Sequence, residues 1–178
     1  VRRPDAGQIF NIGTVFRERG YATQFLYGGR SFFDNMGNFF SSNGFEVLDQ
    51  SSIPSENIQF SNAWGVCDED LFDLAIRNAD KMSPKPFFQF ILTTSNHRPY
   101  TYPGGKIDIP SGTGRDGAVK YSDLSIRNYL MEANKKPWFK DTIFVFVADH
   151  NASVAGGVRI LPADYRIPVI FYAPEHIT

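Results

Sequence analysis

The sequence predicts an α/β fold with a largely parallel central sheet that is flanked by helices. Short apolar runs alternate with segments of helical periodicity, which is the order typical of such sheets. The run at residues 87–92 is almost continuously apolar and turns polar directly afterwards. Parallel strands that are covered on both faces have this composition. We therefore expect one domain over residues 1–178, with polar loops at the ends of buried strands.

The first elements form a helix–strand unit. Residues 8–19 carry apolar side chains at helical spacing, and Gly20 follows at the position where a left-handed residue often ends a helix. Residues 22–27 then predict a short strand that ends in a pair of glycines. Ser31 is placed to cap a second helix, which runs to about residue 41.

Predicted strands and helices also alternate along the rest of the chain. Residues 50–63 are polar and irregular and predict a surface loop. The run at residues 142–147 is the clearest strand in the sequence. The other expected elements are strands at residues 44–49, 87–92 and 167–172, helices at residues 68–81 and 116–135, and an irregular segment at residues 98–115.

The composition is that of a folded globular protein and argues against several classes. The 17 Phe, 8 Tyr and 2 Trp favour a dense core over an aromatic-lined cleft. The formal net charge is −1 and no basic run is present, so nucleic-acid binding is not expected. The single cysteine, Cys67, predicts a small buried side chain. No apolar run approaches the ~20 residues of a membrane helix.

Three predicted strands end in polar residues that suit chemistry. These ends are residues 27–30, residues 93–97 and residues 149–151. In open parallel sheets, ligands bind outside the carboxyl ends of the strands. If the sheet is parallel, all three ends meet at one edge. The sequence therefore predicts a site at that edge.

Asp149 and His150 form the sharpest candidate pair. A carboxylate and an imidazole at the end of a strand can both reach one divalent metal ion. Adjacent side chains in a regular strand point to opposite faces, so the backbone must bend there for both to turn inward. The alternative is that Asp149 caps the next turn and that His150 is a surface side chain. Residue types and spacing leave both interpretations open.

The other candidate residues suit an anionic substrate. His97 and Arg98 can bind an anion through charge-assisted hydrogen bonds, or can belong to a turn that Pro99 shapes. Asp34 and Asn35 can hydrogen-bond a polyol or a phosphate, or can lie on a solvated helix face. The remaining candidates have structural explanations: the acidic residues 68–70 suit the first turn of a helix, and His176 has no evident partner.

Several segments together resemble the lipoteichoic acid synthases and related phosphoglycerol transferases of the alkaline phosphatase and sulfatase superfamily. The strand end at residues 93–100 looks like the substrate loop of that family, and residues 141–150 look like its metal-binding strand. The other similar segments are residues 25–29, residues 33–36 and residues 165–174. The likeness covers nearly the whole chain.

The resemblance implies a fold, a reaction and roles for several residues. It implies a covalent phospho-threonine reaction and one divalent metal ion, usually Mn²⁺, with Mg²⁺ or Zn²⁺ as alternatives. Asp149 and His150 match half of the family's metal ligands, and His97 matches its substrate-binding histidine. Asp34 and Asn35 match its polar substrate contacts only loosely. The family's metal-binding Glu and nucleophilic Thr have no counterpart in this chain.

The resemblance also implies a longer parent protein, its location in the cell and its substrate. We expect the chain to be the C-terminal portion of a sulfatase-like catalytic domain, incomplete at its N-terminal side and inactive by itself. The parent protein is expected at the bacterial inner membrane, anchored there, with its catalytic domain outside the cytoplasm and an anionic phospholipid or glycan as substrate. An unpaired sheet edge in such a piece favours dimers of the fragment.

Two other functions stay open at this point. The first is a hydrolase on the same scaffold, a sulfatase or a phosphodiesterase. A sulfatase needs a Cys or Ser that matures to formylglycine, and Cys67 lacks the neighbouring Pro and Arg of that signal. The second is a non-catalytic homologue that binds lipid, although such a protein has no need of the Asp149–His150 pair.

Overall fold

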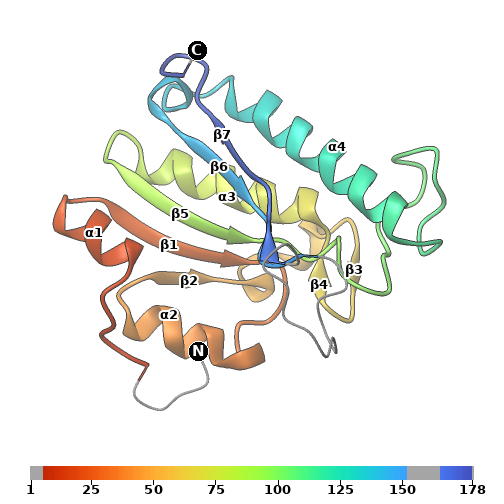
Figure 1. Ribbon diagram of the computed structural model, residues 1–178, viewed down its shortest axis with the longest axis horizontal. Coiled ribbons are helices and arrows are strands. Elements are labelled where there is room, and N and C mark those ends of the chain that lie inside the picture. Colours follow the sequence, from red (N-terminus) through yellow and green to blue (C-terminus); the bar gives the residue numbers. More distant parts are fainter. Residues whose placement is uncertain (1–5, 152–164, 178) are drawn as a thin grey trace. The chain divides into compact units, whose positions relative to one another are not determined.

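The computed structural model describes residues 6–151 and 165–177 of the chain. The chain divides into two compact units, Val1–Ala133 and Asn134–Thr178. Figure 1 shows their helices and strands. The three-stranded sheet lies in the first unit, and a separate two-stranded sheet lies in the second. The expectation of one domain over residues 1–178 stays a prediction.

The sheet of the first unit is parallel throughout. Its strands are β1 (Ala22–Tyr27), β2 (Glu46–Leu48) and β5 (Phe87–Leu92), in the order β2-β1-β5 (Figure 1). Both neighbours run parallel to β1. The expected α/β fold with a parallel sheet flanked by helices is therefore confirmed, and the predicted bounds of β1 and β5 match the observed ones.

Helices cover the two faces of this sheet. Phe16 in α1 (Ile12–Glu18) stacks on Phe88 of β5, and Phe40 in α2 (Met36–Ser42) stacks on Phe25 of β1. The opposite face carries Gln89, whose amide donates to the carbonyl of Ala75 in α3 (Asp68–Met82) at 3.0 Å. Helix α4 (Arg115–Ala133) packs on α3. The unit is thus a helix–sheet–helix sandwich.

The aromatic side chains form a core, as the composition predicts. Phe25 and Tyr27 are buried with Phe45, and Phe40 packs on Phe25 with ring centroids 3.6 Å apart. Each large ring removes much apolar surface from water, and neighbouring rings prefer the stacked and edge-on arrangements seen in this cluster. The cluster fixes α2 on one face of the sheet.

The start of the second helix differs from the prediction. α2 begins at Met36, after a single 3₁₀ turn η1 (Phe33–Asn35), and Ser31 does not cap it. The backbone N–H of Ser31 donates instead to the carboxylate of Asp49 at 2.8 Å. This contact is 18 residues away in the sequence, so local capping rules could not reveal it.

The segment at residues 50–63 is more ordered than predicted. It holds two 3₁₀ turns, η2 (Gln50–Ser52) and η3 (Ser55–Asn57), and the short strand β3 (Ser61–Asn62). β3 pairs antiparallel with β4 (Gly65–Val66). Two-residue strands carry no periodicity, so the sequence pattern could not predict this pair.

The second unit contains a strand pair. The 3₁₀ turn η4 (Phe139–Asp141) precedes β6 (Phe144–Val147), and β7 (Val169–Tyr172) pairs antiparallel with it. Both strands were predicted, with longer bounds. Their side chains are apolar and mostly exposed within the described part of the chain. Among the described residues, no helix is long and apolar enough to cross a membrane.

Candidate functional site

Two of the predicted strand ends meet at the carboxyl edge of the parallel sheet. Gly28 follows β1, and its N–H donates to the carbonyl of Leu92 at the end of β5 at 3.2 Å. The carbonyl of Gly28 accepts the N–H of Val66 at 2.9 Å. A Cβ at Gly65 would lie 2.1 Å from that carbonyl oxygen, so only glycine fits there. The Gly28 N–H is used within the sheet and does not face a ligand.

Asp68 holds the loop that follows β5. Its side chain is 1% exposed, and its Oδ1 accepts the backbone N–H groups of Thr94 and Ser95 at 3.2 and 2.9 Å. Oδ2 accepts the hydroxyl of Ser122 at 2.9 Å. The sequence indicated only an acidic first turn of a helix here. Because the loop lies 26 residues further along the chain, this role was missed.

His97 has a defined pose at this edge. Its Nδ1–H donates to the carbonyl of Arg98 at 2.9 Å, so Nε2 is the ring nitrogen that can contact a substrate. The ring packs on Trp64 with centroids 3.9 Å apart, and Trp64 in turn contacts Phe33 edge-on at 5.5 Å. We name Phe33, Trp64 and His97 the aromatic shelf. Trp64 was missed because it lies between the loop predicted at residues 50–63 and the helix predicted from residue 68, where no pattern singled it out.

Arg98 lies beside a second arginine. The hydroxyl of Tyr100 accepts the Nη2–H of Arg115 at 3.1 Å, and the Arg115 guanidinium lies 5.8 Å from the centre of the Tyr100 ring. The hydrogen bonds from Arg115 and then Arg98 lower the pKa of Tyr100. Two guanidinium groups therefore lie beside Tyr100, and this pair of positive charges favours an anionic ligand. Arg115 and Tyr100 were not among the sequence candidates.

Asp34 and Asn35 lie next to the aromatic shelf in the sequence. Both have left-handed backbone, with φ of 52° and 60°, a conformation that Asp and Asn tolerate better than most residues. Burial, and then the charge of Asp34, raises the pKa of Tyr27. Their predicted contact with substrate stays a prediction.

Asp149 and His150 follow β6 in the second unit. The Nδ1–H of His150 donates to the carbonyl of Asn151 at 2.8 Å, and Nε2 lies 3.5 Å from Oδ2 of Asp149. Both side chains are exposed, at 67% for His150 and 70% for Asp149. A hydrogen bond that holds one ring nitrogen is the usual support of a metal-binding histidine.

The pair fits a divalent metal ion by its chemistry but supplies only two ligands. Among the residues that the structure describes, no group of three or more His, Cys, Asp or Glu side chains could hold a metal ion. A complete shell needs further donors. Metal binding by Asp149 and His150, and the expected meeting of this strand end with the other two, stay predictions.

Cys67 is buried and inert. Its side chain is 2% exposed, and burial raises its pKa to about 12. A thiol needs its thiolate form to act as a nucleophile. The expectation that Cys67 is a small buried side chain is therefore confirmed.

Comparison with known proteins decides the family. The family model described as Sulfatase matches residues 3–178. The chain belongs to the sulfatase family. Phosphoglycerol transferase I of Xanthomonas axonopodis pv. citri is 31% identical to it over 181 residues, which cover 93% of this chain and 25% of that protein. Phosphoglycerol transferase I of Escherichia coli is 28% identical over 153 residues, which cover 79% of this chain and 20% of that protein.

Solved structures agree with this sulfatase family membership. A protein of the alkaline phosphatase superfamily from Vibrio parahaemolyticus superposes with a TM-score of 0.87 at 37% identity, over 96% of this chain and 43% of that one. The lipoteichoic acid synthase LtaP from Listeria monocytogenes shares the fold, with a TM-score of 0.74 at 21% identity over 89% of this chain and 45% of that one. The predicted family is confirmed. The chain spans about a quarter of the length of these curated sulfatase relatives.

Proposed function

We propose that the intact protein is a metal-dependent transferase that moves a phosphoglycerol group, with phosphoethanolamine as the alternative group. The observation that carries the proposal is the fixed pose of His97 on Trp64, beside the Arg98–Tyr100–Arg115 cluster, at the carboxyl edge of a parallel sheet. Relatives named phosphoglycerol transferase I match most of this chain and support the proposal.

His97 and the arginines would bind the phosphoryl group. The Nε2 of His97, when protonated, donates to a phosphoryl oxygen, and Arg98 adds a second positive charge nearby. Donors held in place before the reaction stabilise the charge that develops in the transition state, because they need no reorganisation. The aromatic shelf restricts the ring of His97, and Asp68 restricts the loop that carries it.

Asp149 and His150 would hold the metal ion together with ligands from outside the described residues. Mn²⁺ is the metal we favour, and Mg²⁺ and Zn²⁺ are the alternatives, because a carboxylate and an imidazole suit all three. Such an ion, when bound, lowers the pKa of a hydroxyl and withdraws charge from a phosphoryl oxygen. The nucleophilic Thr is expected upstream of this chain, so the chain by itself would have no turnover.

The charge of the site supports a proposal for the substrate class. Arg98 and Arg115 favour an anionic group, and we place the reaction on an anionic phospholipid or glycan. We propose that the parent protein is anchored at the bacterial inner membrane with this domain outside the cytoplasm. Nucleic acid is not among the proposed partners.

A hydrolase is the second candidate, because the matching family model is described as Sulfatase. A sulfatase of this kind would need a formylglycine precursor, and the buried Cys67 does not serve as one. Water in place of an acceptor would turn the same site into a phosphodiesterase, so the product of the reaction separates the two functions.

The test uses the purified intact protein, phosphatidylglycerol with a labelled headgroup and a glycan acceptor, with Mn²⁺ present. We expect labelled glycan. His97→Ala should lower the rate by at least about a hundredfold, as loss of one transition-state donor does. His176→Ala, an exposed histidine of the second unit, should change little.

Two other results would count against the transferase. Labelled glycerol phosphate in water, with no labelled glycan, would assign a phosphodiesterase. No turnover of phosphatidylglycerol or of an aryl sulfate, together with retained lipid binding, would assign a non-catalytic homologue.

A further inference from the structure

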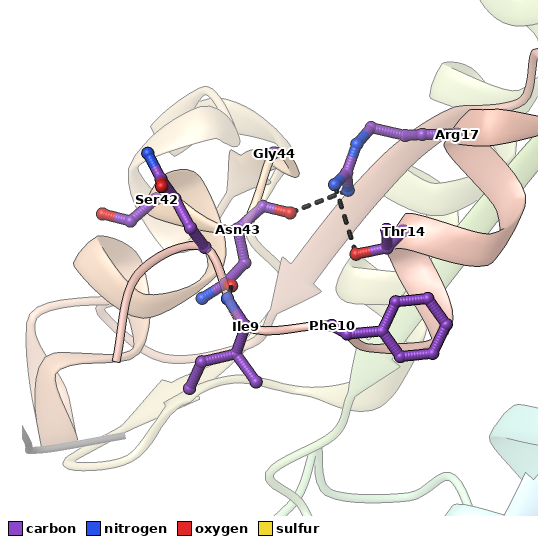
Figure 2. Close-up of a pocket in the computed structure, with 8 residues that line it drawn as sticks. Ile9, Phe10, Thr14, Arg17, Ser42, Asn43 and Gly44 are labelled. Carbon is purple, nitrogen blue, oxygen red and sulfur yellow. Dashed lines mark hydrogen bonds between the residues drawn. The ribbon is translucent and has the colours of Figure 1, made fainter. Parts of the chain in front are cut away.

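A pocket lies at the edge of the first unit opposite the candidate active site. It has a volume of about 410 Å³ and is formed by residues 8–10, α1 and the turn between α2 and β2 (Figure 2). Gly44 of this turn precedes β2, and its carbonyl accepts the hydroxyl of Thr23 near the start of β1 at 3.0 Å. The pocket is therefore at the amino edge of the sheet, whereas Gly28 and His97 lie at the carboxyl edge.

Arg17 is the only charged residue among the eight that line this pocket. Its Nη1–H donates to the carbonyl of Asn43 at 2.7 Å, and its Nη2–H donates to the hydroxyl of Thr14 at 3.5 Å (Figure 2). These partners are uncharged and use two of the five N–H donors of a guanidinium. The group also packs over Gly44, where a Cβ would approach its central carbon to 2.6 Å. The charge is thus fixed in place without being neutralised by the lining residues.

Two exposed apolar side chains also line the pocket. Phe10 is 74% exposed and Ile9 is 45% exposed, and Figure 2 shows the Phe10 ring beside Thr14 and Ile9 beside Asn43. The segment that carries them is held in place, because the N–H of Ile9 donates to the side-chain oxygen of Asn43 at 2.7 Å. The Asn43 amide in turn donates to the carbonyl of Ala6 at 2.8 Å. The wall of the pocket is therefore formed before any ligand arrives.

We propose that this pocket binds a small oxyanion that carries an apolar group, such as an alkyl phosphate. The oxyanion would accept the remaining N–H donors of Arg17, which match the geometry of phosphate and carboxylate oxygens. The apolar group would cover Phe10 and Ile9. The volume lies within the roughly 300–1,000 Å³ typical of small-molecule sites. Binding here is separate from chemistry at His97, because the two sites lie at opposite edges of one sheet.

The test measures binding of hexyl phosphate to the intact protein by calorimetry, in a His97→Ala background that weakens the proposed active site. We expect saturable binding of one molecule. Arg17→Gln should weaken it by at least about tenfold, which corresponds to the loss of one charge-assisted contact. Arg17→Lys should weaken it less, because Lys keeps the charge but loses the planar fork.

Phe10→Ser separates the apolar contact from the ionic one. This side chain is largely exposed, so its removal should leave the thermal unfolding midpoint unchanged. The variant should bind hexyl phosphate less tightly, and its weaker binding of inorganic phosphate should be unchanged. Hexanol, which lacks the oxyanion, should bind much less tightly.

Three results would overturn the proposal. They are the absence of saturable binding of hexyl phosphate, equal binding by a folded Arg17→Gln variant, and binding of hexanol as tight as that of the ester. Phosphatidylglycerol vesicles identify the source of the ligand. Vesicle binding in addition to hexyl phosphate supports a lipid headgroup, whereas vesicle binding alone would indicate a surface charge effect and reject the pocket.

Discussion

At the scale of single residues, the candidate site depends on side chains that hold other side chains. Asp68 has no place in the chemistry, but it fixes the loop that presents His97. Trp64 fixes the ring of His97 itself. Both residues act through the position of a neighbour.

Asp68→Asn should lower the free energy of unfolding by about 1–3 kcal/mol, because an amide replaces the charged acceptor of two buried N–H groups and one partly buried hydroxyl. Urea denaturation of the intact protein measures the change. Asp123→Asn, an exposed position on α4, is the matched control and should stay within about 0.5 kcal/mol of the parent. Equal losses for both variants would mean that Asp68 does not hold the loop.

Trp64→Ala should lower kcat/KM for the phosphoglycerol donor between about tenfold and a hundredfold, since a misplaced catalytic group loses rate at this scale. Steady-state kinetics on the intact protein check this. Trp64→Phe keeps an aromatic ring under His97 and should recover most of the loss. If the Phe variant is as slow as the Ala variant, the stacking explanation is wrong.

At the scale of elements, one carboxylate joins the turn after β1 to the turn after β2. Asp49 accepts the N–H of Ser31 and the N–H of Ser51, both at 2.8 Å. Burial by itself would raise the pKa of Asp49, but the hydrogen bonds from Ser51 and Ser31 outweigh it and hold the pKa below its ordinary value of 3.8. The bonds are therefore strongest while Asp49 is ionised.

This lowered pKa predicts a pH dependence. A carboxylate with a depressed pKa in the folded state contributes stability above its unfolded value, and that stability is lost as the pH falls through the folded value. The parent protein should lose more stability than Asp49→Asn between about pH 5 and pH 2. Urea midpoints across this range measure the difference. Parallel curves for the two proteins would show that the Asp49 bonds contribute nothing.

At the scale of the whole molecule, the proposed metal site would need ligands from beyond the described residues. Asp149 and His150 offer one carboxylate and one imidazole, whereas divalent ions in proteins take four or more ligands. Calorimetry should therefore show tight Mn²⁺ binding by the intact protein and weaker binding, by at least about tenfold, for residues 1–178 alone.

The control for this experiment is a pair of histidine variants in the intact protein. His150→Ala should abolish tight Mn²⁺ binding, and His176→Ala should leave it unchanged. If the intact protein binds no metal ion, Asp149 and His150 have a structural role. That result would favour the interpretation of the protein as a non-catalytic homologue. If residues 1–178 bind as tightly as the intact protein, the expectation of a shared ligand set is wrong.

Local sequence patterns predicted the longer helices and strands and singled out candidate residues at their ends. β1 and β5 lie where apolar runs predicted them, and α3 begins at Asp68 as its acidic first turn indicated. His97 was found because a polar loop follows a buried strand. These features depend on neighbours within a few residues, so periodicity and turn chemistry reveal them.

Tertiary structure decided which residues meet. The contact between Trp64 and His97 spans 33 residues, the bond from Ser31 to Asp49 spans 18, and the clamp of Asp68 on Ser95 spans 27. No pattern in a single sequence encodes such pairs, because they arise only when β1, β5 and the turns after them come together. The sequence by itself thus determined the fold class and the candidate chemistry, and only the packing of the sheet decided what positions that chemistry.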